Sequence, residues 1–290
     1  MPPERIVSQP VELLPFLFVA WPETKKKQVR AWLKFGSVAV NGRVITQFDH
    51  KLKPGDKVMI RPKGMAAPET KLASGIRIRH EDTDIIVIEK PAGLLSIASA
   101  SEEEKTAYAF LTNHVRVGNP RGRERVWVVH RLDRETSGVM IFAKNEAAKT
   151  ALQSDWETVE KKYLAVVEGA PRHDSGTYDS LLDESNPLKV YPANGTGPET
   201  RHAVTHYRVT KKGKATTLVE LTLETGRRHQ IRVQLAEDGC PIVGDKKYGA
   251  HTNPIKRIAL HATSLRFIHP ATRKEMRFDS PLPGDLGRLV

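Results

Sequence analysis

The chain has 290 residues, a formal net charge of +12 and a hydrophobic fraction of 39%. That length accommodates one large domain, or one large and one small, and the composition is typical of a soluble globular protein. The excess of lysine and arginine indicates a partner rich in phosphate groups and does not bear on the fold.

Three further features exclude whole classes of protein. Cys240 is the only cysteine, so neither an intramolecular disulfide nor a cysteine-based metal site is possible. The longest apolar run, Val11 to Trp21, contains Pro15 and is too short to cross a bilayer, and the first ten residues lack the parts of a secretory signal. We therefore expect a cytoplasmic protein that binds nucleic acid and not a membrane.

The basic charge is concentrated near the start of the chain. Between Trp21 and Gly64 there are eleven basic residues and three acidic ones. Lys26 to Phe35 has the apolar spacing of a helix, and Gly36 marks its end. Short strands and turns are expected to follow at Val38–Val40, Asn41-Gly42, Val44-Ile45, Pro54–Asp56 and Lys57–Ile60. These elements predict a compact α/β module in residues 1–64.

The chain changes character after this module. Residues 65–75 are rich in Pro, Ala and Lys without an apolar period, which predicts a linker. Residues 76–290 are then expected to form a second domain. Its first elements would be strands at Ile76–Arg79 and Asp84–Ile88, a helix opened by Glu102–Glu104 and running through Leu111, and a strand at Val126–Val129.

The most informative segment follows that last strand. It is His130-Arg131-Leu132-Asp133-Arg134-Glu135-Thr136-Ser137-Gly138, and it leads into the apolar run Val139–Ala143. The arginines on either side would keep Asp133 ionised at neutral pH, and a positioned, ionised carboxylate can act as a nucleophile or a base. Taken alone, however, an aspartate between two arginines is more often a residue that caps a turn.

The wider sequence pattern favours the catalytic interpretation. HRLDRETSGVMIFAK closely resembles the signature of RluA-type pseudouridine synthases, which is HRLD-x-x-TSG followed by a hydrophobic strand and a lysine. The resemblance extends from about Glu89 to Pro283. Other segments match the family in the same order: Lys161–Ala165, Thr205–Tyr207, Thr225–Arg232, Gly239–Gly249, Ile258–Ala262 and His269-Pro270.

This resemblance implies an enzyme that isomerises uridine to pseudouridine in RNA and requires no cofactor. It makes Asp133 the catalytic carboxylate, Arg232 its partner, bidentate if the geometry allows, and Tyr163 the residue against the base. It also implies that the target uridine is flipped out and that Arg131 takes its place in the RNA stack. Further contacts to RNA or substrate are expected from His130, Arg227, His229 and Leu260.

The resemblance leaves the chemical step open. Asp133 could attack the uracil ring, attack the ribose or remove a ribose proton, and each route needs an ionised carboxylate. Taken alone, Tyr163 would be an ordinary strand tyrosine and Arg232 a solvated helix residue. The chain departs from the family pattern at Leu94–Ser96, Arg228 and Gln234. None of these positions belongs to the central chemistry, so the departures bear on RNA contacts and target choice.

The basic module in turn resembles the small RNA-binding domain named after the fourth small-subunit ribosomal protein. The similarity rests on its helix, on the Val40–Gly42 turn and on Leu52–Val58. It implies phosphate contacts, whose affinity falls steeply with salt. We expect those contacts from Lys25, Lys26, Lys27, Arg30, Lys34 and Arg43.

Together these features predict an α+β protein. The small basic RNA-binding domain would precede a catalytic domain with a mixed, largely antiparallel sheet and an active-site cleft across it. The expected substrate is structured RNA, ribosomal first and transfer RNA second, and the expected state is a monomer. His202 and His206 are four residues apart, but their surroundings indicate a strand and no third ligand follows, so no metal site is expected.

Two other functions remain open. One is a catalytically inactive relative that binds RNA or assists ribosome assembly, against which the presence of Asp133, Tyr163 and Arg232 argues. The other is a hydrolase that releases free uracil. Glycosidic hydrolases commonly use two carboxylates, and near Asp133 only Glu135 could be the second.

Overall fold

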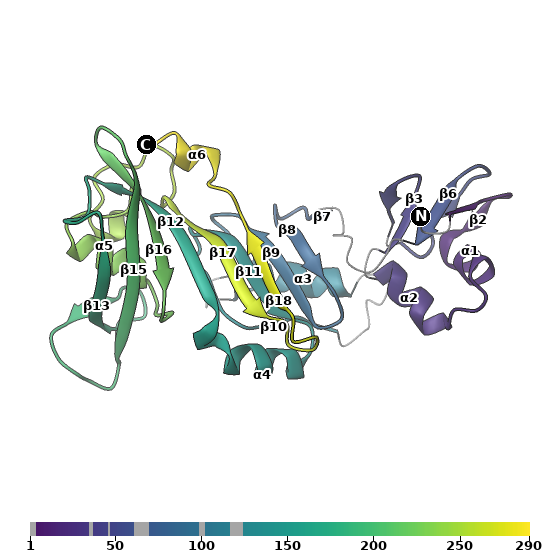
Figure 1. The fold of residues 1–290 in the computed structure, drawn as a ribbon, viewed down its shortest axis with the longest axis horizontal. Coiled ribbons are helices and arrows are strands. Elements are labelled where there is room, and N and C mark those ends of the chain that lie inside the picture. The colour runs from purple at the N-terminus through teal and green to yellow at the C-terminus, as the bar shows by residue number, and fades with distance from the viewer. Residues whose placement is uncertain (1–3, 35–36, 46, 61–69, 99–101, 117–123) are drawn as a thin grey trace.

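The computed structural model describes residues 4–34, 37–45, 47–60, 70–98, 102–116 and 124–290. Within these ranges the chain forms two parts with separate sheets and separate hydrophobic cores. The first part gathers at one end of the molecule, and a long twisted sheet occupies the rest (Figure 1). Among the described residues, no helix combines the length and the apolar character that crossing a bilayer requires.

The first part is a small α/β unit. Its helices are α1 (Leu13–Ala20) and α2 (Lys26–Lys34), whose apolar side chains pack against the strands. A four-stranded sheet has the order β1 (Glu4–Ile6), β6 (Lys57–Ile60), β3 (Val38–Val40) and β4 (Arg43–Val44), and a two-stranded sheet joins β2 (Val11–Glu12) to β5 (Lys51–Leu52).

The elements predicted for this unit are largely confirmed. Asn41 and Gly42 have φ angles of +50° and +78°, as the predicted hairpin turn requires, although the return strand begins one residue earlier than expected. Helix α1 was not predicted. It contains Pro15 in its first turn, where the missing N–H has no intrahelical partner to lose.

The second part is built on a twelve-stranded sheet. Ten strands follow the order β14-β13-β15-β16-β12-β17-β11-β9-β8-β7, while β10 pairs with β11 and β18 with β17. Only the β11–β17 pair is parallel among the described strand pairs, which confirms the predicted mixed, largely antiparallel sheet. The strands are β7 (Thr70–Lys71), β8 (Arg77–Glu81), β9 (Ile85–Lys90), β10 (Trp127–Val128), β11 (Ser137–Ala143), β12 (Glu160–Glu168), β13 (Ser175–Asp183), β14 (Tyr191–Ala193), β15 (Thr200–Lys212), β16 (Thr216–Leu223), β17 (Leu260–Ile268) and β18 (Glu275–Asp279).

Helices cover both faces of this sheet at β9 and β11. Successive side chains of a strand point to opposite faces, so Ile86 and Phe142 pack in the cluster with α3 (Ala107–Val115), whereas Val87 and Ile141 pack in the cluster with α4 (Glu146–Ser154). This burial on two faces explains why both strands are continuously apolar. The remaining helices are α5 (Gln230–Glu237), α6 (Gly284–Gly287) and the 3₁₀ turns Trp156–Thr158 and Lys246–Tyr248.

Two sequence expectations need correction here. The helix expected from Glu102 begins only at Ala107, because Thr106 accepts a hydrogen bond from the Ala109 N–H and acts as its N-cap. The Glu102 carboxylate instead accepts the Lys105 N–H in the turn before the helix. Within the range expected to be a linker, Thr70–Lys71 forms β7 and pairs with β8, while residues 65–69 lie outside the described part.

Candidate active site

Asp133 lies in the loop between β10 and β11, and neighbouring segments hold that loop in place. The Ser96 hydroxyl donates to the Leu132 carbonyl at 2.7 Å and accepts the Leu132 N–H at 3.1 Å. Residues 93 and 134 are bonded twice, because the Gly93 N–H donates to the Arg134 carbonyl and Arg134 Nε donates to the Gly93 carbonyl. The backbone on both sides of Asp133 is therefore tied to the loop that follows β9.

Lys90, at the end of β9, secures the same two loops from inside. Its fully buried ammonium group donates to the carbonyl oxygens of Pro91, Leu94 and Arg134 at 3.0, 2.8 and 3.2 Å. Burial lowers the pKa of Lys90 to about 7, although the nearby charge of Asp133 acts in the opposite direction.

Gly138 allows the strand that follows Asp133 to pack closely against β17. Its φ angle is +120°, and a Cβ added there would lie 2.1 Å from the carbonyl oxygen of Ala262. The register pairs Gly138 with Ala262 in the parallel β11–β17 contact. Only glycine fits this approach, which gives the Thr-Ser-Gly part of the sequence pattern a structural cause.

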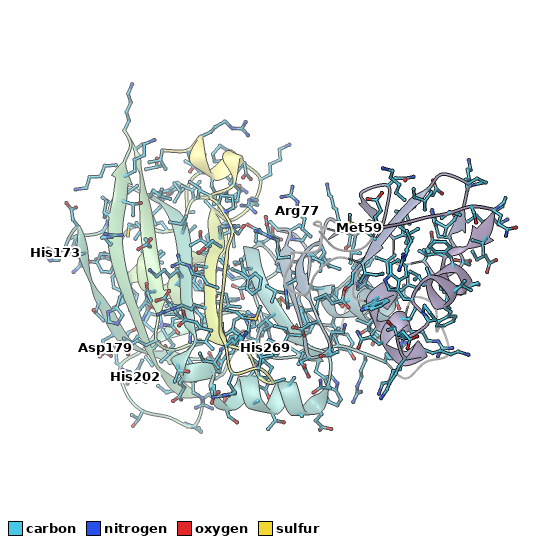
Figure 2. The ribbon with its side chains drawn as sticks, turned by 45° about the vertical axis from the view of Figure 1, so that its right-hand side comes forward. Met59, Arg77, His173, Asp179, His202 and His269 are labelled. Atoms are coloured by element: carbon cyan, nitrogen blue, oxygen red, sulfur yellow. The ribbon has the colours of Figure 1, made fainter. Side chains whose placement is uncertain are left out.

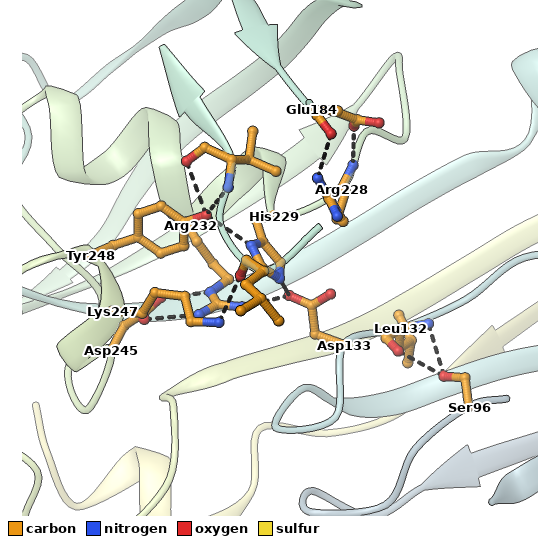
Figure 3. A network of polar contacts seen from close by, with 12 residues as sticks. Ser96, Leu132, Asp133, Glu184, Arg228, His229, Arg232, Asp245, Lys247 and Tyr248 are labelled. Carbon is orange, nitrogen blue, oxygen red and sulfur yellow. Dashed lines mark hydrogen bonds and ion pairs between the residues drawn. The ribbon is translucent and has the colours of Figure 1, made fainter. Parts of the chain in front are cut away.

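Arg232, in the first turn of α5, bridges two carboxylates. Its Nη1 donates to Asp133 Oδ2 at 2.9 Å, while its Nε and Nη2 donate to the two oxygens of Asp245 at 2.6 and 2.9 Å (Figure 3). The bidentate partner is thus Asp245, and Asp133 receives a single bond. Burial opposes the charge on Arg232, but Asp245 and then Asp133 outweigh it and raise the pKa.

His229 also lies close to Asp133. Its backbone is left-handed, with φ at +54°, and its Nδ1 lies 2.8 Å from the Tyr248 hydroxyl oxygen. Its Nε2 lies 3.8 Å from Asp133 Oδ2. Burial lowers the pKa of His229 to about 4, so the imidazole is neutral at neutral pH.

Tyr163 lies on β12 where two hydrophobic cores meet, and it packs against both. Its strand neighbours are Leu221 on β16 and Ala262 on β17, with a register shift between Lys162 and Tyr163 on the β17 side. Burial raises the pKa of Tyr163, and the charge of Asp133 raises it further. The hydroxyl is therefore protonated at neutral pH, and Asp133 is close enough to influence it.

The structure brings some of the other predicted site residues to this region. Arg131 and Arg227 are both exposed, and Arg227 is held by a bond from its Nε to the His202 carbonyl. Leu260 is buried in the core against which Tyr163 packs.

His130 has a different environment from the one expected. Its Nε2 accepts the Ile141 N–H at 3.1 Å, and its ring lies 4.5 Å from that of Trp156. Burial, with a smaller contribution from Lys161, lowers the pKa of His130 to about 3. The ring is thus engaged by the protein itself, and the expected RNA contact has no geometric support in the described part of the chain.

The predicted basic contacts of the first 64 residues can be placed in part. Lys25, Lys26, Lys27 and Arg30 are exposed. Lys26 Nζ and the Arg30 guanidinium, both on α2, lie 5.7 and 5.6 Å from the centre of the Phe18 ring on α1, so the two cations share one aromatic contact. The side chains of Lys34 and Arg43 lie outside the described part.

Gln234 on α5 and Ser96 beside the Asp133 loop, which are two of the departures from the family pattern, both bond to other parts of the protein. Gln234 is buried, accepts the Thr205 hydroxyl and donates to Ser180 and to the Ala203 carbonyl. Ser96 holds Leu132, as described above. Both residues bond within the protein, whereas the sequence analysis had related these departures to RNA contacts and target choice.

One group in the described ranges has the spacing of a metal site. Ligand atoms of Asp82, Asp84 and His269 lie within 4.8 Å of one another. Hydrogen bonds already use them: Asp82 accepts from His80 and His269, and His269 Nδ1 accepts two backbone N–H groups. These bonds account for the cluster without a cation.

His202 and His206, considered from the sequence, lie exposed on β15 as expected. Each lies beside a carboxylate: Asp179 on β13 for His202, and Glu224, directly after β16, for His206. Figure 2 shows His202 beside Asp179, well away from His269. The ion pairs across the strands explain this histidine spacing.

Sequence reasoning missed Asp245, Tyr248 and Lys90. All three lie in segments that the resemblance singled out, or next to one, but their partners are distant in the chain. Asp245 bonds to Arg232, Tyr248 to His229 and Lys90 to Arg134. The available signal was an aspartate in the otherwise basic segment Gly-Asp-Lys-Lys-Tyr-Gly, which gives no indication of its partner.

Comparisons with known proteins agree with this geometry. The family model described as RNA pseudouridylate synthase matches residues 84–237. The RNA pseudouridine synthase YlyB of Bacillus subtilis is 36% identical over 270 residues, covering 91% of this chain and 88% of that protein. The ribosomal large subunit pseudouridine synthase D of Xanthomonas campestris is 36% identical over 290 residues, covering 93% and 85%.

A solved structure extends the agreement to the fold. Human RNA pseudouridylate synthase domain containing 4 superposes with a TM-score of 0.59 at 27% identity, over 72% of this chain and 90% of that one. The resemblance to pseudouridine synthases seen in the sequence is therefore confirmed, and the chain belongs to the RNA pseudouridylate synthase family.

Proposed function

We propose that this RNA pseudouridine synthase modifies ribosomal RNA, with transfer RNA as the second candidate, and that Asp133 is its catalytic carboxylate. The assignment of Asp133 rests on two successive ion pairs, from Asp245 to Arg232 and from Arg232 to Asp133. It also rests on the backbone hydrogen bonds that fix the Asp133 loop on both sides of that residue. Support for ribosomal RNA comes from the relatives named ribosomal large subunit pseudouridine synthase D.

The reaction makes specific demands on these residues. The bond from ribose C1′ to N1 of uracil breaks, a bond from C1′ to C5 forms, and the C5 proton leaves while N1 gains one. Asp133 supplies the negative charge, as a nucleophile or as a base. Tyr163 supplies a flat ring and a protonated hydroxyl at the inner end of the site.

The anchoring of Arg232 determines which oxygen of Asp133 can react. Both Arg232 Nη1 and His229 Nε2 approach Oδ2. Among the described contacts, Oδ1 is thus the oxygen left for the substrate. Because Asp245 holds the guanidinium by two bonds, Arg232 can stay in place while Asp133 changes its charge or its covalent partner.

The geometry also bears on the hydrolase alternative. Asp245 is a second carboxylate near Asp133, but it is 1% exposed and both its oxygens bind Arg232. Glu135 is half-buried, with its carboxylate 4.0 Å from Arg134 Nε. Neither arrangement supplies the free second carboxylate that hydrolysis commonly uses. The inactive-relative alternative conflicts with the assembled Asp133, Arg232 and Tyr163.

The same proposal includes the organisation of the chain. Residues 1–64 would be an RNA-binding domain of the ribosomal-protein type and residues 76–290 the catalytic domain. Two separate cores and the exposed cations on α2 support this division. We further propose that the enzyme acts as a monomer in the cytoplasm.

The test is a comparison of pseudouridine, nucleotide by nucleotide, in total RNA from cells with and without the gene. The expected result is the loss of at least one mark in ribosomal RNA and its return on complementation. Marks lost only from transfer RNA would overturn the choice of RNA. Incubation of purified enzyme with RNA should release no free uracil, because a synthase retains the base and a hydrolase releases it.

A further inference from the structure

Residues 184–191, which run from the end of β13 to the first residue of β14, carry exposed apolar side chains close to the candidate site. Five large hydrophobic side chains are exposed in the described ranges, and three of them belong to the first 64 residues. The other two, Leu188 at 73% and Tyr191 at 43%, both lie on this segment. An exposed apolar pair next to a substrate site indicates a contact surface.

The segment is bonded to residues of the site itself. The Val190 N–H and carbonyl both bond to the Tyr248 hydroxyl, at 3.0 and 3.1 Å, and Lys247 Nζ donates to the Leu188 carbonyl at 2.8 Å. The same Tyr248 hydroxyl contacts His229, whose ring faces Asp133 (Figure 3). Two side chains therefore separate this segment from Asp133.

Arg228 holds the segment from its other end. Its guanidinium donates to three backbone carbonyls, those of Glu184, Asn186 and Pro187, at 2.8, 2.6 and 2.7 Å. Its own N–H donates to the Glu184 carboxylate at 2.8 Å (Figure 3). A residue with a short side chain could make none of the three carbonyl bonds. The guanidinium of Arg228 thus fixes the backbone of this segment.

Cations accompany the exposed apolar surface. Lys189 Nζ lies 5.2 Å from the centre of the Tyr191 ring and 5.4 Å from that of Tyr248. Three more exposed cations lie at, or next in sequence to, the residues that bond to this segment: Lys246, Lys247 and Arg227. Single-stranded RNA presents flat bases, which stack on aromatic side chains, together with phosphates, which attract cations. The Tyr191 ring could stack with a base, and Lys189 beside it could attract a phosphate.

We propose that residues 184–191 form a platform on which a nucleotide flanking the target uridine stacks, and that Arg228 is the positioning residue that holds this platform beside the site. The proposal rests on the RNA pseudouridine synthase function given above. A base of any identity stacked on Tyr191 and Leu188 would hold the RNA strand beside the site. Arg228 would then contribute to RNA binding through the position of the platform.

The test measures steady-state kinetics of the full-length enzyme on protein-free ribosomal RNA from cells that lack the gene. The double variant Leu188→Ala, Tyr191→Ala should raise KM about tenfold, the size of one lost stacking contact, with kcat within about twofold. Arg228→Ala should raise KM likewise, and Arg228→Lys should recover only part of it. The control is Thr272→Ala, which truncates an exposed side chain in the turn between β17 and β18.

Each outcome decides the proposal. Inactivity of the wild-type enzyme on this RNA would overturn the proposed function and the platform together. An active wild type with an unchanged KM in the double variant, at unchanged Tm, would overturn the platform alone. If the variants were impaired only on assembled ribosomal subunits, the surface would bind a protein partner and the RNA platform would be wrong.

Discussion

At the scale of single residues, Asp245 orients the guanidinium of Arg232 toward Asp133. A guanidinium bound by two parallel bonds has one orientation, and here that orientation directs Nη1 at Asp133 Oδ2. The buried pair with Asp245 also compensates for placing a cation that is 6% exposed inside the protein. Asp245 thus acts on the reaction through Arg232.

The replacement Asp245→Asn tests this role. Asparagine retains one acceptor oxygen but presents N–H groups to the guanidinium, so Arg232 should shift away from Asp133. Because a misplacement of about an ångström can cost up to about a hundredfold, we expect kcat to fall ten- to a hundredfold while KM changes less than about threefold. The control is Asp279→Asn, which removes an exposed ion pair with Arg277. Equal kcat for the Asp245 variant and the wild type would contradict the role.

The sequence predicted three residues that the structure places in one region, and it missed the residues that hold them. Asp133, Tyr163 and Arg232 stand in segments whose order is recognisable, and the structure brings them together. Asp245 and Tyr248 act through partners thirteen and nineteen residues away, and such pairs follow from three-dimensional contact, which a linear pattern does not show.

At the scale of elements, His261 on β17 joins the start of β11 to the segment that follows β18. Its Nδ1 lies 2.9 Å from the Ser137 hydroxyl on β11 and its Nε2 lies 3.0 Å from the Ser280 hydroxyl after β18. The side chain is fully buried, and burial lowers its pKa to about 4. The folded protein therefore favours the neutral ring.

This shift predicts how stability depends on pH. The unfolded chain binds a proton at His261 below pH 6.5 and the folded chain only below about 4, so stability falls as the pH falls through this window. By pH 5 the loss should reach about 2 kcal/mol. Urea unfolding from pH 7 to 4.5 should show a slope that His261→Gln reduces and that His202→Gln, on exposed β15, leaves unchanged. Identical slopes for His261→Gln and the wild type would contradict this account.

The elements themselves were predictable where local chemistry decides them. The Asn41-Gly42 hairpin and the apolar strands β9 and β11 match the prediction, because turn residues and continuous apolar runs act locally. The start of α3 did not match, since a threonine cap competed with the acidic residues before it. The order of the twelve strands depends on contacts such as Gly138 with Ala262, 124 residues apart, and was available only through the family resemblance.

At the scale of the whole molecule, the first 64 residues concentrate positive charge that the catalytic site does not use. Lys25, Lys26, Lys27 and Arg30 are exposed on and just before α2. If they contact phosphates, each contact releases counterions, and the affinity for RNA depends on salt accordingly.

Replacing these four cations with glutamine should lower RNA affinity and flatten its salt dependence. Each lost phosphate contact changes the slope of log K against log salt by about 0.7–0.9, so we expect a change of at least about 1.5. The control replaces four other exposed cations with glutamine. They lie on β15 or just after it: Arg208, Lys211, Lys212 and Lys214. If both quadruple variants changed the slope equally, the effect would be one of net charge and the proposed role of the module would be wrong.

The most direct test of the central claim concerns Asp133. Asparagine has nearly the same shape as aspartate and can still accept the bond from Arg232, so Asp133→Asn removes little but the charge. Pseudouridine should be mapped in RNA from cells lacking the gene and complemented with wild type or with Asp133→Asn. We predict that wild type restores every lost mark and that the variant restores none, with purified activity lowered at least a hundredfold. Restoration of the marks by the variant would contradict the assignment of Asp133 as the catalytic carboxylate.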